Sequence, residues 1–506
     1  MGAVTAVPAA GRAATLARDA SALLAGVLLP GAFAPYGLWP LAILSPAVLF
    51  LTWHRADARR AARRGFLFGL AAFLTGTWWT YVSIHDFGQA PAVLAAFLTV
   101  ALAVIIGLYY GALGWLAARL LPAGGSVRWL LGLPAGWLLV EWVRGWFLSG
   151  FPWLSLGYSQ TDAPFGALAP LAGVYGISWA CAAAAGAVAA LVAGRTTGRL
   201  VAGAVLGALV GASYLIADRT WTRPDGTALS AALVQGAVGQ DEKWDPAALA
   251  PTRELYLRLT REHWGADLIV WPEAAIPDLL DRQADFLAAL DAEAREHGSE
   301  LLLGILEEDR ERGQYHNVLV SLGGIPGIYR KRHLVPFGEY FPVPDFVRSW
   351  LRLMNLPYTD FEPGRPDPPP LSLAGTRIAP TICYEDAFGE EQRVFLPQAG
   401  LLVNVSNDAW FGDTMAPHQH LQIARMRSME TGRWMLRATN NGISAFIDPH
   451  GRVVARSGQF ETEVLEGRVQ PMAGATPWVR FGDGPLAGLA TLIAVGAALR
   501  RRHGER

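Results

Sequence analysis

The sequence predicts a multi-span α-helical membrane domain, with about eight transmembrane helices, that carries one globular α/β domain. Of the 506 residues, 52% are hydrophobic and only 17% are charged, whereas soluble chains average about 25% charged residues. The apolar residues form nearly continuous runs over residues 1–217 and again at 484–499, and the segment between them has an ordinary mixed composition. The net charge of −1 argues against a nucleic-acid-binding protein, which usually has a clustered basic face.

The predicted spans are stretches that approach the roughly 20 mostly apolar residues needed to cross a bilayer. They cover 19–34, 37–53, 65–84, 90–118, 127–148, 166–193, 199–217 and 484–499. The first two are short and interrupted by proline. The first follows Arg12 and Arg18 as a signal peptide would, but it has no clear small-residue cleavage site and another apolar span follows directly. We therefore expect a retained helix and domains at 1–217, 218–483 and 484–506.

Basic residues in the short loops predict the orientation of these spans. They are Arg55, Arg59, Arg60, Arg63, Arg64, Arg119, Arg128, Arg195, Arg199 and the C-terminal sequence RRRHGER. The intervening loops 85–89 and 149–165 contain no lysine or arginine. With eight spans all basic loops lie on one side, which the positive-inside rule assigns to the cytoplasm. The sequence therefore predicts a multi-pass protein of the bacterial cytoplasmic (inner) membrane, with both termini inside and segment 218–483 on the periplasmic or extracytoplasmic side.

Two charged residues interrupt the fifth predicted span. Glu141 and Arg144 lie in the apolar sequence WLLVEWVRGWF. Charges inside a membrane are costly and tend to pair or to line a cavity. Two interpretations stay open, an internal ion pair near the outer interface and a contribution to a lipid or substrate cavity.

The segment 218–483 alternates short β-rich runs with amphipathic stretches. Runs such as LSAALVQGAV, DLIVWP, ELLLGILEED, RIAPTI and GLLVNVS are typical of buried strands. Two stretches, DPAALAPTRELYLRLTREHW and PDLLDRQADFLAALDAEAREHG, have helical spacing, and Pro277 and Gly298 bracket the second. This alternation predicts an α/β domain or a layered α-β-β-α sandwich.

Three polar residues follow predicted strands, where α/β folds place their chemistry. They are Glu273 in WPEAAIP, Lys331 in YRKRHLVPFGEYFP and Cys383 in TICYED. Glutamate and lysine in loops are usually solvated charges, and a free cysteine is most often a small buried hydrophobe. However, an extracytoplasmic cysteine normally pairs, and the only other cysteine, Cys181, lies inside the sixth span. Cys383 is therefore a candidate nucleophile.

A thiol needs a base or nearby cations to become a nucleophile. Glu273 can accept the thiol proton, and Lys331 can favour the thiolate and stabilise a developing oxyanion. A cysteine–histidine site is also open on sequence spacing, because the segment contains His316, His333, His418 and His420. The HQH sequence lacks companion ligands, so we predict no metal site. Acyl chemistry with a thiol, a base and a cation also needs no cofactor, and we predict none.

The three motifs together carry a family resemblance. WPEAAIP, YRKRHLVPFGEYFP and TICYED, in this order, resemble the Glu–Lys–Cys motifs of the nitrilase superfamily. With membrane spans on both sides, and with the segments EWVRGWFLSGFPWLSLGY and NVSNDAWFGDTMAPHQHLQIARMRSMETGR, the chain resembles the apolipoprotein N-acyltransferase family over nearly its whole length. Two positions depart from the family pattern. Ala237 stands where the family commonly has QGN, and YHNV replaces a YNS-like run.

The resemblance implies a nitrilase-like domain and a reaction. An acyl chain moves from a membrane phospholipid, through a cysteine thioester, to the N-terminal amine of a diacylated apolipoprotein. The implied catalytic residues are Glu273 as base, Lys331 as cation and Cys383 as nucleophile. The implied supporting and substrate-binding residues are Glu339, Tyr384, Glu385, Trp244, Trp410 and Phe411. The implied partners are the phospholipid donor, the apolipoprotein acceptor and the bilayer, and a monomer suffices.

Two alternatives share parts of this pattern. A membrane-anchored nitrilase-type amidase would use the same Glu–Lys–Cys triad with water as the second nucleophile. A transporter or receptor with an outer binding domain would not need the triad, and it predicts paired polar residues in several spans. Seven spans before Cys383 exceed what a tether needs, which favours the transferase.

Overall fold

The computed structural model describes residues 9–340 and 361–504. The chain forms two compact units, one made of Met1–Arg219 and Phe481–Arg506 and the other of Thr220–Arg480. The segment SWLRLMNLPY (Ser349–Tyr358), whose aromatic and apolar residues suggest a membrane-interface loop, lies outside the described residues.

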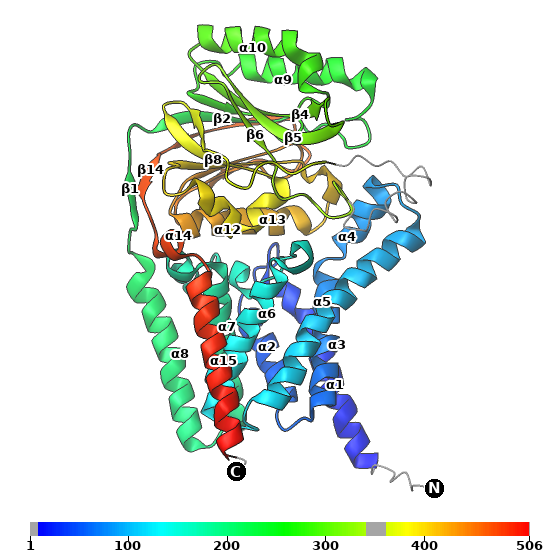
Figure 1. Cartoon of the computed structure of the whole chain (residues 1–506), viewed down its shortest axis with the longest axis vertical. Coiled ribbons are helices and arrows are strands. Elements are labelled where there is room, and N and C mark those ends of the chain that lie inside the picture. Colours follow the sequence, from blue (N-terminus) through cyan, green and yellow to red (C-terminus); the bar gives the residue numbers. More distant parts are fainter. Residues whose placement is uncertain (1–8, 341–360, 505–506) are drawn as a thin grey trace. The chain divides into compact units, whose positions relative to one another are not determined.

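The first unit is helical. Its helices are α1 (Ala9–Leu28), α2 (Leu41–Thr52), α3 (Ala58–Gly76), α4 (Trp79–Val82), α5 (Ala92–Leu120), α6 (Leu133–Arg144), α7 (Ala169–Ala193), α8 (Thr196–Ala217) and α15 (Gly484–Gly504) (Figure 1). Small residues allow close packing here. A Cβ added at Gly65 of α3 would lie 2.1 Å from the carbonyl oxygen of Tyr110 in α5, and one added at Gly114 would lie 2.3 Å from that of Ala61. The backbones of α3 and α5 are therefore in direct contact.

Length and hydropathy single out four described segments that could each cross a membrane. They are Arg12–Ala32, Ala92–Leu120, Pro164–Ala193 and Thr196–Ala217. The pair Ala58–Gly76 and Trp79–Phe87, bent by 53°, would make a fifth, and Leu41–Thr52 is apolar but shorter. The prediction of several apolar helices is confirmed, whereas this criterion supports fewer than the eight expected spans.

The two charged residues of the fifth predicted span take separate partners. Oε1 of Glu141, which is fully buried, accepts hydrogen bonds from the Trp137 indole at 2.7 Å and from the backbone N–H of Leu156 at 3.1 Å. Arg144 donates to the Trp153 carbonyl at 2.6 Å and to the Ser155 hydroxyl at 2.9 Å. Among the ion pairs of the described residues, none joins Glu141 to Arg144. In the described part of the chain the structure therefore shows no direct ion pair between them, and each group has one buried atom, Oε2 of Glu141 and Nε of Arg144, without a hydrogen-bond partner.

The second unit contains two six-stranded sheets. The first has the order β13 (Glu463–Val469), β2 (Leu229–Gln235), β3 (Leu268–Val270), β4 (Glu300–Asp309), β5 (Gln314–Leu322), β6 (Gly327–Arg330). The second has the order β12 (Val453–Arg456), β11 (Ala445–Ile447), β10 (Met435–Thr439), β9 (Leu401–Ser406), β8 (Thr376–Ile382), β7 (Leu371–Leu373). A separate ribbon pairs β1 (Thr222–Pro224) with β14 (Met472–Gly474).

The sheets stack face to face between two helical layers. Helices α9 (Leu249–Arg261) and α10 (Ala284–Glu296) cover the outer face of the first sheet, and α12 (Gly389–Gln392) and α13 (Ala416–Thr431) cover that of the second (Figure 1). Alternation within strands builds this arrangement. Leu268 and Val270 join the core between the sheets, whereas Ile269 packs toward the core formed with α9 and α10. The unit is an α-β-β-α sandwich.

Strand direction brings the candidate residues to strand ends. β2, β3 and β4 are parallel in the first sheet, as are β8, β9 and β10 in the second. Glu273 follows β3, Lys331 follows β6 and Cys383 follows β8. β6 has the direction of β3 and β4, because β5 is antiparallel to both β4 and β6. Glu273 and Lys331 therefore emerge at the same edge of their sheet.

Candidate functional site

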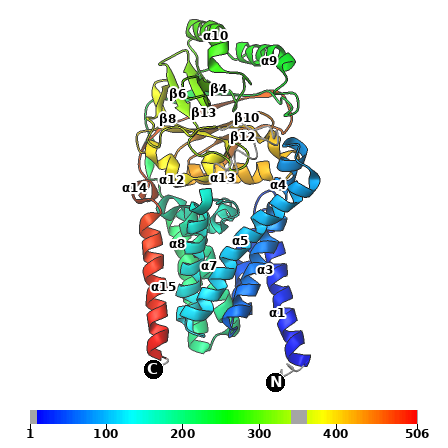
Figure 2. The ribbon, with the colours of Figure 1, turned by 45° about the vertical axis from the view of Figure 1, so that its right-hand side comes forward.

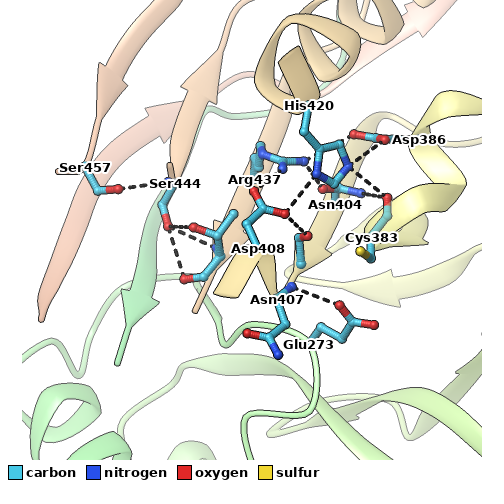
Figure 3. Close-up of polar contacts among 12 residues, drawn as sticks. Glu273, Cys383, Asp386, Asn404, Asn407, Asp408, His420, Arg437, Ser444 and Ser457 are labelled. Carbon is cyan, nitrogen blue, oxygen red and sulfur yellow. Dashed lines mark hydrogen bonds and ion pairs between the residues drawn. The ribbon is translucent and has the colours of Figure 1, made fainter. Parts of the chain in front are cut away.

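Cys383 occupies a sharp turn at the end of β8. It is the first residue of a 3-10 turn, Cys383–Ala387, and has a φ of +54°. This left-handed conformation is uncommon for a residue with a Cβ. The side chain is partly exposed, and Figure 3 draws the Glu273 carboxylate below it. The turn thus places Cys383 at the margin of the core between the sheets, against which it packs.

Glu273 is held by donors from both sheets. Its Oε1 accepts from the Asn317 amide at 2.7 Å and from Nζ of Lys331 at 3.3 Å. Its Oε2 accepts from the backbone N–H of Asn407 at 2.9 Å. The residue is 7% exposed. These bonds fix the direction of the carboxylate and so define where it can accept a proton.

Lys331 lies between two carboxylates. Its Nζ is 3.3 Å from Oε1 of Glu273 and 2.7 Å from Oε1 of Glu339, and the side chain is 1% exposed. The other oxygen of Glu339 accepts from the backbone N–H of Val335 at 2.8 Å. Burial alone would lower the pKa of Lys331, but Glu273 and Glu339 outweigh it and raise that pKa above the ordinary lysine value. Lys331 is therefore a permanent cation in this site.

The thiol of Cys383 needs a base. Burial, and then the charge of Glu273, raise its pKa well above the usual value, while Lys331 acts in the opposite direction. The resting thiol is therefore protonated at neutral pH. A carboxylate that disfavours the thiolate electrostatically is also a group that can accept its proton during attack.

Three of the four candidate histidines contact groups other than the Cys383 thiol. His420 meets the backbone carbonyl of Cys383 at 3.2 Å, and its ring nitrogens also meet Asp386 and Asp408. His333 meets Glu391 at 2.7 Å, and Nδ1 of His316 meets the Glu362 carbonyl at 2.8 Å. These three rings contact carboxylates or backbone carbonyls and not the Cys383 thiol, so the geometry disfavours the cysteine–histidine alternative at these residues.

Glu385 connects the nucleophile turn to the loop of Lys331. It is 2% exposed. Its carboxylate accepts from the Tyr329 hydroxyl at 2.8 Å and from the backbone N–H groups of Arg332 at 2.6 Å and Ile382 at 2.7 Å. Burial raises the pKa of this carboxyl above its ordinary value. Its oxygens are occupied by protein donors, so Glu385 links the end of β8 to the loop that carries Lys331.

The aromatic candidates are more exposed. Trp244 is 47% exposed and Trp410 39% exposed. Trp410 and Phe411 share the 3-10 turn Asp408–Phe411, directly after β9 and Asn407. The ring of Tyr384, next to the nucleophile, lies 5.0 Å from that of Phe388. Exposed rings on these loops leave apolar surface for an acyl chain or a lipid.

Lys243 is a site residue that the sequence did not reveal. It is 2% exposed, and its Nζ donates to the backbone carbonyl of Glu273 at 3.1 Å. Burial lowers its pKa to about 8, against the opposing effects of Glu273 and Cys383. In the polar run GQDEKWDP a lysine resembles a solvated charge, so no local signal distinguished it. Asn317 and Asn407 were missed for the same reason.

The arrangement can perform nucleophilic acyl chemistry with protein groups alone. It combines a thiol, an adjacent fixed carboxylate and a buried cation, the groups needed for attack on an acyl carbon. Within the described residues, no cluster of three or more histidine, cysteine, aspartate or glutamate side chains is arranged to hold a metal ion.

Comparison with known proteins agrees with this chemistry. Residues 25–187 match the family model of the apolipoprotein N-acyltransferase N-terminal domain, and 230–477 match that of carbon-nitrogen hydrolases. An apolipoprotein N-acyltransferase of Methylococcus capsulatus is 46% identical over 486 residues, covering 95% of this chain and 96% of the relative. The chain belongs to the apolipoprotein N-acyltransferase family.

Further members of this family align with similar coverage. The apolipoprotein N-acyltransferase of Azotobacter vinelandii is 44% identical over 96% of this chain and 95% of its own length. The apolipoprotein N-acyltransferase of Vibrio cholerae is 40% identical over 96% of this chain and 98% of its own length. A solved carbon-nitrogen hydrolase of Helicobacter pylori covers 48% of this chain and 89% of its own at 19% identity, with a TM-score of 0.37. The family assignment depends on the sequence relatives, not on that structure.

Proposed function

We propose that this protein transfers an acyl chain from a membrane phospholipid to the N-terminal amine of a diacylated apolipoprotein, with Cys383 as the acyl carrier. The observation that carries the proposal is the meeting of Glu273, Lys331 and Cys383 in one site. This site belongs to a chain that aligns over 95% of its length with a protein named for this activity.

The first half-reaction forms a thioester. Glu273 accepts the thiol proton as the sulfur of Cys383 attacks the ester carbonyl carbon of the phospholipid. The ammonium of Lys331 and the backbone N–H of Tyr384 stabilise the oxyanion of the tetrahedral intermediate. The carbon–oxygen bond to glycerol then breaks, and Glu273 returns the proton to the leaving alkoxide. The products are the acylated Cys383 and a lysophospholipid.

The second half-reaction uses the same groups. The neutral amine of the apolipoprotein attacks the thioester carbonyl, and Glu273 accepts one amine proton. The carbon–sulfur bond breaks, the amide forms, and the proton returns to the sulfur of Cys383. An amine attacks a thioester more readily than an oxygen ester, which favours this order of steps.

The helical unit supplies access to lipid substrates in this proposal. We infer eight spans, a membrane domain at 1–217, an extracytoplasmic catalytic domain at 218–483 and a returning helix at 484–506. The basic loops support this orientation. In addition, the start of α1 at Ala9 and the end of α15 at Gly504 lie at the same end of the helical unit (Figures 1 and 2). A monomer suffices, because the chain itself contains all three proposed catalytic residues.

The test is detection of the acyl-enzyme. Purified protein in detergent is incubated with a phospholipid of defined chains, and the peptide containing Cys383 is examined by mass spectrometry. We expect an added acyl mass on Cys383, its absence in Cys383→Ala and its retention in Cys181→Ala, which removes a fully buried cysteine of α7. An adduct on any other residue, or none at all in folded protein, would show that the assignment is wrong.

A further inference from the structure

Four charged side chains form a buried cluster beneath the nucleophile turn. Asp386 belongs to the turn itself, Asp408 to the turn after β9, His420 to α13 and Arg437 to β10. Each is at most 1% exposed. We call these four residues the buried quartet, and Figure 3 shows them around His420. The quartet does not include Glu273, Lys331 or Cys383, and the mechanism above gives it no role.

The geometry of the quartet determines its protonation. Nδ1 of His420 is 2.9 Å from Oδ1 of Asp408, and Nε2 is 3.0 Å from Oδ1 of Asp386. Carboxylate oxygens accept and do not donate, so both ring nitrogens carry protons and His420 is an imidazolium. Arg437 completes the cluster, 3.2 Å from Oδ2 of Asp386 and 3.0 Å from Oδ2 of Asp408. Two cations therefore balance two carboxylates.

The quartet is linked directly to the nucleophile. Nε2 of His420 also lies 3.2 Å from the carbonyl oxygen of Cys383. The Asn404 amide donates to the same oxygen at 3.4 Å and to Oγ1 of Thr381 at 3.0 Å, and its own carbonyl oxygen accepts from Arg437. These donors hold the Cys383 peptide in its left-handed conformation, which other residues with a Cβ rarely adopt.

We propose that His420 is a positioning residue for the acyl transfer, which holds the Cys383 carbonyl and neutralises Asp386 and Asp408 so that the thiol can ionise. This inference rests on the proposed function, because it assumes that Cys383 is the acyl carrier. Asp408 acts to raise the pKa of Cys383. Without the imidazolium, one negative charge of the quartet would stay unbalanced.

The groups around His420 also define its own titration. Burial and Arg437 act to lower the pKa of His420, but Asp386 and Asp408 outweigh them and raise it from 6.5 to about 9. The ring of Phe411 is 6.4 Å away and carries no charge. The imidazolium is therefore fully present at neutral pH and is lost as the pH rises through about 9.

The test compares variants that change the charge of the quartet in opposite directions. His420→Gln leaves a net charge of −1, Asp386→Asn leaves +1, and the double variant is neutral. The full-length protein in detergent is treated with iodoacetamide across pH 6–10, and alkylation of Cys383 is followed by mass spectrometry. This readout reports thiol ionisation without any lipid substrate, so it can fail independently of the transferase proposal.

We expect shifts of opposite sign. At pH 7.5, alkylation of Cys383 should slow roughly three- to tenfold in His420→Gln, accelerate by a similar factor in Asp386→Asn and return close to the wild-type rate in the double variant. In the acyl-transfer assay, His420→Gln should lower kcat with little change in KM for phospholipid. If only one of the two single variants folds, the direction in which its alkylation rate changes decides whether the proposal holds.

Three outcomes would overturn the proposal. The first is an unchanged alkylation profile in folded His420→Gln and Asp386→Asn. The second is a shift of the same sign in both, which indicates a general loosening of the turn. The third is loss of folded structure in all three variants, which assigns the quartet to stability alone.

Discussion

Replacing Lys331 by methionine removes the ammonium and keeps most of the side-chain volume. The structure places this Nζ 3.3 Å from Glu273 and 2.7 Å from Glu339, at 1% exposure. Removing one partner of such a buried ion pair typically costs about 3–5 kcal/mol, because the remaining charge is left uncompensated. Here two carboxylates lose their shared cation, so the upper part of that range applies to stability.

The effect on chemistry has a separate origin. If Lys331 stabilises the oxyanion, its loss should slow acyl-enzyme formation by roughly 10²–10³-fold, the usual effect of removing one such donor. The assay is the initial rate of acyl addition to Cys383, measured by mass spectrometry. Thermal unfolding of the same preparation gives the change in Tm, so the two effects are measured together.

A matched control lies next to Lys331 in the chain. Arg330 pairs with Glu307 at 2.7 Å between Nη2 and Oε1, and its side chain is 41% exposed. For such a partly exposed pair, Arg330→Met should cost about 1 kcal/mol or less and leave the acylation rate within about threefold of wild type. The reasoning is refuted if folded Lys331→Met also acylates Cys383 within threefold of the wild-type rate.

Three further predictions follow from neighbouring groups. Glu385→Gln should slow acyl-enzyme formation at least about tenfold and lower Tm. The reason is that one backbone N–H that now donates to the carboxylate would face an amide N–H instead. An unchanged rate would show that Glu385 does not support the site. Burial lowers the pKa of Lys243 from 10.5 to about 8, so the charged lysine destabilises the folded state most at low pH. Lys243→Met should therefore raise Tm more at pH 7 than at pH 10. Equal changes in Tm at the two pH values would contradict this. Cys181→Ala should keep full transfer activity, because the Cys181 thiol is fully buried in α7 and has no role in the proposed reaction. A folded but inactive variant would contradict this.

The large elements of the fold were predictable because their signals are local. Apolar runs predicted the helices of the first unit, and the ordered strand ends predicted the places of Glu273, Lys331 and Cys383. The count of spans did not follow from the apolar runs, since α2 has only 12 residues and α3 bends into α4. Length alone does not distinguish a short buried helix from a span.

The polar network was not predictable because its members are distant in sequence. Asn407 lies 134 residues from the Glu273 carboxylate it binds, and Arg437 lies 51 residues from Asp386. In sequence, HQH resembled an incomplete metal site, and its second histidine instead bridges two carboxylates. Likewise, Glu141 and Arg144 had the spacing of a helical ion pair, but each hydrogen-bonds to separate indole, backbone or hydroxyl groups.

The central claim is tested most directly by the fate of the isolated acyl-enzyme. The protein is loaded from a phospholipid with an isotope-labelled acyl chain, freed of excess lipid and divided between buffer alone and buffer with a diacylated lipopeptide. We predict that the label stays on Cys383 in buffer and moves to the lipopeptide N-terminus when the peptide is added. Release of the label as free fatty acid at the same rate in both samples would contradict the transferase and identify a hydrolase.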